Sequence, residues 1–173
     1  TSLGERWEEQ GDGVEHEGLL ARRLNYDPLT LPEEILVATC GVDTQKDRLE
    51  AQVMGWGHNY EAWVIEYKVF WGDPNAVNVW NELDLYLKTR FKTESGRSIA
   101  ISATCIDSGG HHTNQVYSFT KPRQGRRIFA IKGANVPGKP IVSKPSYVGK
   151  TQVALYTVGT DTAKENIFAR LNA

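Results

Sequence analysis

Two aspartates follow apolar segments of strand length, at positions where carboxylates could bind a metal ion. Asp43 follows residues 35–42, and Asp107 follows residues 99–106. Carboxylates at the ends of neighbouring strands repel each other, and a hard divalent cation such as Mg²⁺ or Mn²⁺ relieves the repulsion. Two such ions can clamp both the attacking and the leaving oxygen of a phosphodiester. The pattern therefore favours metal-dependent phosphodiester hydrolysis.

A third carboxylate is wanted to hold two ions, and Asp161 is the candidate. It lies after the strand-like segment 153–158, at the start of a helical segment. Asp47 is expected to be a turn residue or to support the metal ligands, and Lys164 to orient a phosphate, to balance Asp161 or to be solvated. The acids also have structural interpretations, because Asp43 can initiate a turn and Asp161 suits a helix N-terminus.

Positive charge is concentrated in the C-terminal part of the chain. The formal net charge is −1, yet residues 108–173 hold 10 bases and 2 acids, whereas residues 1–66 hold 5 bases and 14 acids. Such a basic segment predicts a surface that binds phosphates, and a solvated basic face is the alternative. The predicted DNA-binding residues are Lys121, Arg123, Arg126, Arg127, Lys132, Lys139, Lys144 and Lys150.

Two other motifs do not lead to a site. Residues 133–140 (GANVPGKP) approach the phosphate-binding loop of ATPases, but proline stands where a hydroxyl must bind Mg²⁺, and no helix follows. No nucleotide site of that kind is expected in this chain. His111 and His112 lack Cys or His partners at zinc-binding spacing, so we expect them in a loop or at a helix start.

The elements that must position these residues follow from the pattern of apolar residues. Segments 35–42, 48–58 and 63–71 predict a three-stranded antiparallel meander. A helix capped by Asp73 is expected next, and its apolar face runs from Val77 to Phe91. It is followed by a strand at 99–106, a short helix at 113–119 and a strand at 127–132. A loop at 133–150, a strand at 153–158 and a helix with a Thr162/Glu165 capping box complete the chain. Because a helix leads into 99–106, this strand should lie parallel to the first. This is the layout of the ribonuclease-H-like α/β fold, with helices on both faces, and it makes these two strands neighbours.

One folded domain is expected at residues 31–173, preceded by an interdomain linker or arm at residues 1–30 that is polar, acidic and rich in glycine. The chain starts without methionine or a leader, so it looks like a piece of a longer protein. No apolar segment approaches the roughly 20 residues that cross a bilayer. Cys40 and Cys105 are expected on opposite faces of the sheet, which argues against a disulfide and fits a reducing compartment.

Beyond these features, the chain resembles the large subunit of phage terminases of the GpA type, found in lambda-like phages. The resemblance covers about residues 30–172 in the right order. The segments that carry it are 39–50 (TCGVDTQKDRLE), 55–57 (GWG), 72–74 (GDP), 80–84 (WNELD), 106–110 (IDSGG), 131–133 (IKG) and 158–164 (VGTDTAK).

The resemblance implies the nuclease part of a DNA-packaging protein whose N-terminal part is an ATPase motor. It implies a ribonuclease-H-like endonuclease that cuts concatemeric double-stranded DNA with two Mg²⁺ or Mn²⁺ ions held by Asp43, Asp107 and Asp161. It further implies a small terminase subunit and the capsid portal as partners, no membrane, and the host cytoplasm during phage assembly as the location.

Two other interpretations are compared with this one. Sugar kinases and their actin-like relatives also begin with a strand ending on aspartate, but they need a Gly-Thr phosphate turn and a second lobe, and Thr44-Gln45 and 173 residues supply neither. A non-catalytic module that docks DNA or the portal, with structural acids, remains the alternative.

Overall fold

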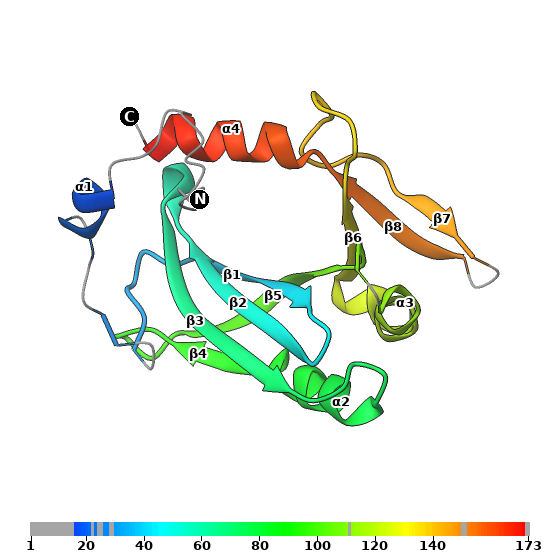
Figure 1. Ribbon diagram of the computed structural model, residues 1–173. Helices are drawn as coiled ribbons and strands as arrows, with labels where there is room; N and C mark the ends of the chain where they lie inside the picture. Colours follow the sequence, from blue (N-terminus) through cyan, green and yellow to red (C-terminus); the bar gives the residue numbers. More distant parts are fainter. Residues whose placement is uncertain are drawn as a thin grey trace, which may run out of the picture.

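An eight-stranded mixed sheet forms the centre of the computed structural model, which describes residues 16–21, 23, 26, 27, 30–110, 112–149 and 152–171. Along the sheet the strand order is β3-β2-β1-β5-β6-β8-β7, and β4 pairs with β5 off this path (Figure 1). The strands are β1 Val37–Thr44, β2 Arg48–Trp56, β3 Ala62–Trp71, β4 Arg90–Lys92, β5 Ser98–Asp107, β6 Ile128–Gly133, β7 Ser146–Val148 and β8 Val153–Val158. The helices are α1 His16–Ala21, α2 Val77–Tyr86, α3 Thr113–Thr120 and α4 Thr160–Leu171, with short 3₁₀ helices η1 His58–Tyr60 and η2 Lys121–Arg126. None of the described helices is long and apolar enough to span a membrane.

The antiparallel half of the sheet is the predicted meander β1-β2-β3. Leu49, Ala51 and Val53 alternate along β2 and are fully buried, which fixes the register because a slip by one residue would expose all three. The tight connection between β1 and β2 is closed by the Gln45 N–H, which donates to the Arg48 carbonyl at 3.0 Å. The end of β1 and the start of β2 are therefore held close together.

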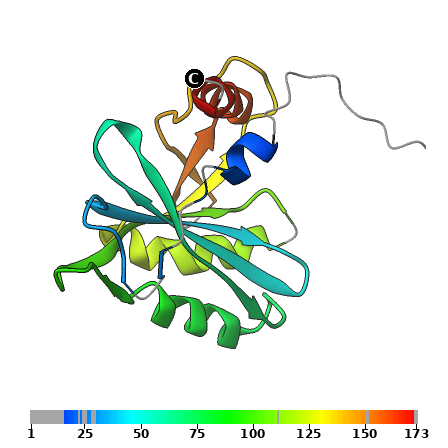
Figure 2. The same ribbon diagram turned by 90° about the vertical axis from the view of Figure 1, so that its left-hand side faces the viewer.

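The parallel half consists of β1, β5, β6 and β8, which pair in that order. Strand β5 is reached through α2 and the hairpin strand β4, and it lies directly beside β1, as predicted. With helices on both faces, the mixed sheet confirms the predicted ribonuclease-H-like α/β fold (Figure 2). The C-terminal ends of β1 and β5 consequently meet at one edge of the sheet.

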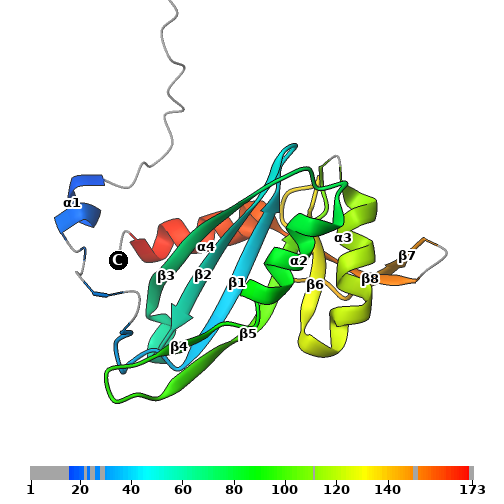
Figure 3. The same cartoon turned by 90° about the horizontal axis from the view of Figure 1, so that it is seen from below.

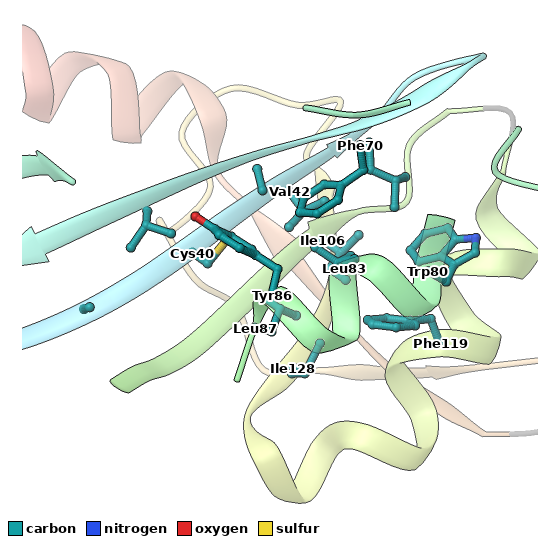
Figure 4. Packing of buried hydrophobic residues seen from close by; sticks show 14 of the residues in the cluster. Cys40, Val42, Phe70, Trp80, Leu83, Tyr86, Leu87, Ile106, Phe119 and Ile128 are labelled. Atoms are coloured by element: carbon teal, nitrogen blue, oxygen red, sulfur yellow. The ribbon is translucent and has the colours of Figure 1, made fainter. Parts of the chain in front are cut away.

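Helices α2 and α3 cover one face of the sheet and build the core with it (Figures 3 and 4). Leu83 is fully buried, Tyr86 packs edge-on against Phe70 of β3 at 5.4 Å between ring centroids, and Trp80 contacts Phe119 of α3 at 5.0 Å. These aromatic contacts join α2 both to the sheet and to α3.

Helix α4 crosses the opposite face of the sheet (Figures 1 and 3). None of its described residues is buried, and Ile167 and Phe168 are exposed. Its C-terminal Arg170 lies over the ring of Tyr60 in η1, at 4.2 Å from the ring centroid. The two faces of the sheet are thus covered very differently, one by a packed core and the other by a helix without buried side chains among its described residues.

Several local predictions need correction. Helix α2 begins at Val77 rather than at Pro74, because the Asp73 carboxylate accepts the Asn75 N–H at 2.8 Å in a turn that precedes the helix. Phe91, assigned to this helix from its spacing, lies in β4 because the chain turns at Leu87.

The C-terminal third also departs from the predictions in two places. The 133–150 segment is not entirely loop, since it contains β7. Thr162 does not cap α4: the helix starts at Thr160, and the Thr162 hydroxyl donates to the Lys139 carbonyl at 2.8 Å.

The two cysteines lie as predicted, on opposite faces of adjacent strands, and both are free thiols. Burial, with a smaller contribution from Cys105, raises the pKa of Cys40 to about 12. At the N-terminal boundary, Leu31 is fully buried and its N–H donates to the Lys92 carbonyl at 2.8 Å. Much of segment 1–30 lies outside the described residues, and its role as a linker stays a prediction.

Candidate functional site

Asp43 and Asp107 lie at the C-terminal ends of adjacent parallel strands, β1 and β5. Val42 is in register with Ile106, and the Thr44 hydroxyl donates to the Asp107 carbonyl at 3.3 Å, which ties the two strand ends together. Both carboxylates line one open hollow at this edge of the sheet. Its lining residues are Asp43, Thr44, Gln45, Lys46, Asp107, Gly109, Gly110, His112, Lys132, Gly133 and Asn135.

Each carboxylate is oriented by an uncharged neighbour. The Gln45 side-chain amide donates to Asp43, and the Gly109 N–H donates to Asp107 Oδ1 at 3.0 Å. A Cβ atom at Gly109 would lie 3.3 Å from Asp107 Oδ1, so a side chain there would crowd this oxygen. In the described part of the chain neither aspartate forms an ion pair. Oxygen ligands for a cation are therefore present and are not neutralised by a base.

Glu50 lies directly across from Asp43 in the β1-β2 register, but its carboxylate is engaged. It accepts hydrogen bonds from Arg48 Nε at 2.6 Å and from the Tyr67 hydroxyl at 2.6 Å. The hydrogen bond from Tyr67, then that from Arg48, lowers the pKa of the Glu50 carboxyl. Glu50 is thus paired with Arg48, and its oxygens are already occupied.

Two lysines reach the same hollow from different elements. Lys132 comes from β6, the neighbour of β5, and Lys46 comes from the turn between β1 and β2. Lys132 was among the predicted DNA-binding residues. Positive side chains next to paired carboxylates suit a substrate that brings its own negative charge.

Asp161 is exposed in the first turn of α4 and is not among the residues that line this hollow. The start of α4 nevertheless approaches the hollow, because a Cβ atom at Gly133 would lie 3.2 Å from the Thr160 methyl group. Gly159 allows a close approach of the chain, since a Cβ atom there would lie 2.2 Å from the Lys139 carbonyl oxygen. Lys164 lies one turn further along α4 and is exposed.

Asp47 lies outside the hollow and is paired with Arg48 Nη1 at 2.7 Å. It lines a second hollow together with Lys46, Asp73, Asn75 and His112. Asp47 therefore neighbours the Asp43/Asp107 hollow without contributing to its lining, in keeping with its expected place in the turn.

The predicted DNA-binding residues divide into several groups. Arg123 Nε and Arg126 Nη1 both contact Asp84 Oδ1, at 2.7 and 2.6 Å, so these two guanidinium groups have an intramolecular partner. Arg127 has a left-handed backbone with φ of 57° at the end of η2. Lys121, Lys139 and Lys144 are exposed, and Lys150 lies outside the described residues.

The donor set in the hollow fits a hard cation that keeps much of its water. Within the described part of the chain, no group of three or more His, Cys, Asp or Glu side chains is arranged to hold a metal ion. Mg²⁺, however, is commonly bound through only one or two protein carboxylates, together with waters and substrate phosphates. Asp43 and Asp107 meet that requirement.

Besides Gln45 and Gly109, which orient the two aspartates, sequence reasoning missed four residues that the tertiary structure places in or beside the hollow: Lys46, Glu50, His112 and Asn135. Glu50 could have been found from the hairpin, since a tight turn after Asp43 brings the residue seven positions later opposite it. No sequence signal identifies the other three, because their placement depends on where loops cross the strand ends.

Comparisons with known proteins show which family this chain resembles over its whole length. Residues 1–173 match the family of the terminase large subunit gpA, endonuclease domain. The chain is 33% identical over 174 residues to the terminase large subunit of Enterobacteria phage P21, and 35% identical over 171 residues to that of Escherichia phage lambda. These alignments cover 100% and 98% of this chain but only 27% and 26% of the two relatives. No solved structure is significantly similar to the chain.

Proposed function

Because this chain belongs to the family of terminase large subunit gpA endonuclease domains, we propose that it is a divalent-metal-dependent DNA endonuclease. Its substrate is concatemeric double-stranded DNA, which it cuts by hydrolysis of phosphodiester bonds during packaging of a viral genome. The observation that carries the proposal is the pair Asp43 and Asp107, which line one hollow without a basic partner among the described residues.

Asp43 and Asp107 would hold the first Mg²⁺ or Mn²⁺ ion, and Asp161, from the start of α4 beside the hollow, would complete the set for a second. Such ions stabilise the charge that develops on the attacking and leaving oxygens of a phosphodiester. Gln45 and the Gly109 N–H fix the orientation of the two carboxylates in the hollow. Lys132 draws the phosphate toward them. Lys164 and Asp47 support the site from α4 and from the β1-β2 turn.

The proposed contacts to the DNA backbone are Lys121, Arg127, Lys132, Lys139, Lys144 and Lys150, whereas Arg123 and Arg126 are held by Asp84. Contacts to phosphates position a protein on DNA without reading its sequence, and each one makes binding more sensitive to salt. DNA affinity of this domain should therefore fall steeply as the salt concentration rises and should depend little on base sequence.

The domain acts as part of a longer protein, since the chain spans about a quarter of the length of the curated relatives that it matches. An ATPase motor in the same polypeptide, a small terminase subunit and the capsid portal are its proposed partners. Its proposed place of action is the host cytoplasm during phage assembly.

Cleavage of supercoiled plasmid tests the proposal. With Mg²⁺ or Mn²⁺ the chain should nick and linearise the plasmid, and Asp43→Ala or Asp107→Ala should reduce the rate by about a hundredfold to a thousandfold, the range seen for loss of a principal electrostatic group. Glu82→Gln, an exposed change on α2, is the matched control and should cut normally. An Asp43→Ala protein that still nicks plasmid would refute the assignment. DNA binding without any metal-dependent cleavage would instead favour the non-catalytic docking module.

A further inference from the structure

His112 is a buried polar side chain without a partner. Its residue is only 8% exposed, and neither ring nitrogen forms a hydrogen bond, although both nitrogens are inaccessible to solvent. It precedes α3 at the N-cap position but makes no side-chain cap. A buried polar atom left unsatisfied destabilises the folded state, and such atoms are rare in folded proteins. This histidine therefore needs an explanation beyond a place at the start of a helix.

The location of His112 indicates what could satisfy it. His112 is a lining residue of the hollow that contains Asp43 and Asp107 and also of the second hollow beside it. It forms part of the wall that the two share. A neutral imidazole offers one N–H donor, and an imidazolium offers two. A ligand rich in acceptor oxygens that enters from either hollow would supply the missing partner once the ring shifts slightly toward it.

Lys46 is the other residue common to both hollows. It is exposed in the β1-β2 turn. The acids of the second hollow are already engaged: Asp47 pairs with Arg48 at 2.7 Å, and Asp73 accepts the N–H and the side-chain amide of Asn75 at 2.8 and 3.0 Å. An ammonium group and an imidazole thus share one wall, close to the N-terminus of α3, where a helix favours anions.

We propose that Lys46 and His112 form a phosphate subsite that holds a non-scissile phosphate of the DNA strand being cut. The inference rests on the proposed nuclease function and deepens it. The scissile phosphate occupies the Asp43/Asp107 hollow, and the same strand continues past the shared wall into the second hollow. Lys46 supplies charge, and the His112 N–H supplies a directed hydrogen bond to a phosphate oxygen. Together they set the position of the scissile group.

The test compares cleavage kinetics with stability. Lys46→Gln and His112→Phe are assayed for KM and kcat on a short DNA duplex with Mn²⁺, for melting temperature, and for the rise in melting temperature that Mn²⁺ causes. Each change should raise KM about tenfold, as expected for loss of a hydrogen bond to a charged group, and should lower kcat less. His112→Phe should melt no lower than wild type, because two orphaned nitrogens are removed. His112→Gln keeps a hydrogen-bond donor, so it should raise KM less than His112→Phe does. The rise caused by Mn²⁺ should persist in all three variants.

Controls use the same substitutions away from the hollows. His58→Phe in η1 and Lys92→Gln on β4 are exposed and should leave KM unchanged. A His112→Phe protein that melts lower and keeps the wild-type KM would mean that the histidine is structural, and loss of the Mn²⁺ effect would make it a metal ligand. Either result overturns the subsite, as does an unchanged KM in Lys46→Gln. If cleavage depends on Asp43 but Lys46→Gln and His112→Phe keep the wild-type KM, only this inference fails. If the wild-type chain neither binds nor cuts DNA, the nuclease proposal fails as well.

Discussion

The carboxylates of this domain differ in whether basic side chains neutralise them. Asp84 of α2 is surrounded by three bases, with Lys88 Nζ at 2.8 Å, Arg123 Nε at 2.7 Å and Arg126 Nη1 at 2.6 Å. Asp43 and Asp107 share a hollow and are oriented only by an amide and a backbone N–H. One group is neutralised by the fold, whereas the other is left with negative charge that the fold does not compensate.

The difference separates an acid residue that stabilises the fold from the two acid residues of the proposed metal site. Asp84 joins α2 to η2, which are distant in sequence, and its side chain is only 15% exposed. Burial raises its pKa, but hydrogen bonds from Lys88, Arg123 and Arg126 outweigh this effect and hold the pKa well below its usual range. A carboxylate that forms ion pairs with neighbouring basic side chains stabilises the protein. An uncompensated pair adds nothing to stability, and in the proposed function it binds a metal ion.

The largest expected difference between the two groups is their response to metal. Mn²⁺ at a hundredfold excess over its dissociation constant should stabilise the wild-type domain by about 2.7 kcal/mol, and Asp43→Asn should abolish this effect. Without metal, Asp43→Asn should be no less stable than wild type, because repulsion from Asp107 is removed. Thermal melts with and without Mn²⁺ measure both quantities. A melting temperature that does not respond to metal would place Asp43 with Asp84 as a structural acid.

Replacing Asp84 should show the reverse behaviour. Asp84→Ala leaves three bases without their partner and should lower the free energy of unfolding by about 2 kcal/mol, between the values for exposed and for buried ion pairs. The stabilisation by Mn²⁺ should remain. Urea unfolding gives the first value, and melts with metal give the second. If Asp84→Ala removed the metal effect while the protein stayed folded, the proposed separation of the two groups would be wrong.

The contribution of Asp84 to the free energy of unfolding should disappear at acidic pH. Because its pKa is lowered in the folded state, the stability that it contributes is complete above the unfolded-state pKa near 3.9 and is lost as pH falls toward the lower folded-state value. The difference in unfolding free energy between wild type and Asp84→Asn should therefore be constant from pH 7 to about pH 5 and should narrow below about pH 4. Urea titrations across this range measure it. If the difference in unfolding free energy between the two proteins increased at acidic pH, the pKa of Asp84 could not be lowered in the folded state.

The smallest expected effects distinguish basic residues that are paired with Asp84 from basic residues that contact DNA. Arg126→Gln removes one of three partners of Asp84 at a partly exposed position and should cost under about 1 kcal/mol of stability. Lys132→Gln, in the hollow, should cost no stability but should reduce the slope of log Kd against log salt for DNA by about 1. Unfolding and binding titrations on the same two proteins give the comparison. Equal loss of salt slope in both would show that Arg126 also contacts DNA.

The fold was largely predictable because its signals are local. The alternation of Leu49, Ala51 and Val53 identified a strand of the meander, and the helix before β5 implied its parallel pairing with β1. The prediction failed where local patterns competed with packing. Phe91 fits the spacing of a helix face, yet the chain turns at Leu87 and buries this ring from a short strand.

The sequence by itself determined that two strands end on aspartates and that these strands are neighbours, because apolar periodicity and connection type suffice for both conclusions. Only the tertiary structure decided which charges remain available. Arg123 and Arg126 belong to the basic segment, but packing of α2 against η2 brings them to Asp84, 39 and 42 positions away. Lys46 and His112 received no site role from the sequence, yet the turn after β1 and the start of α3 cross the same strand ends. Such contacts depend on how distant elements pack, which local sequence patterns do not encode.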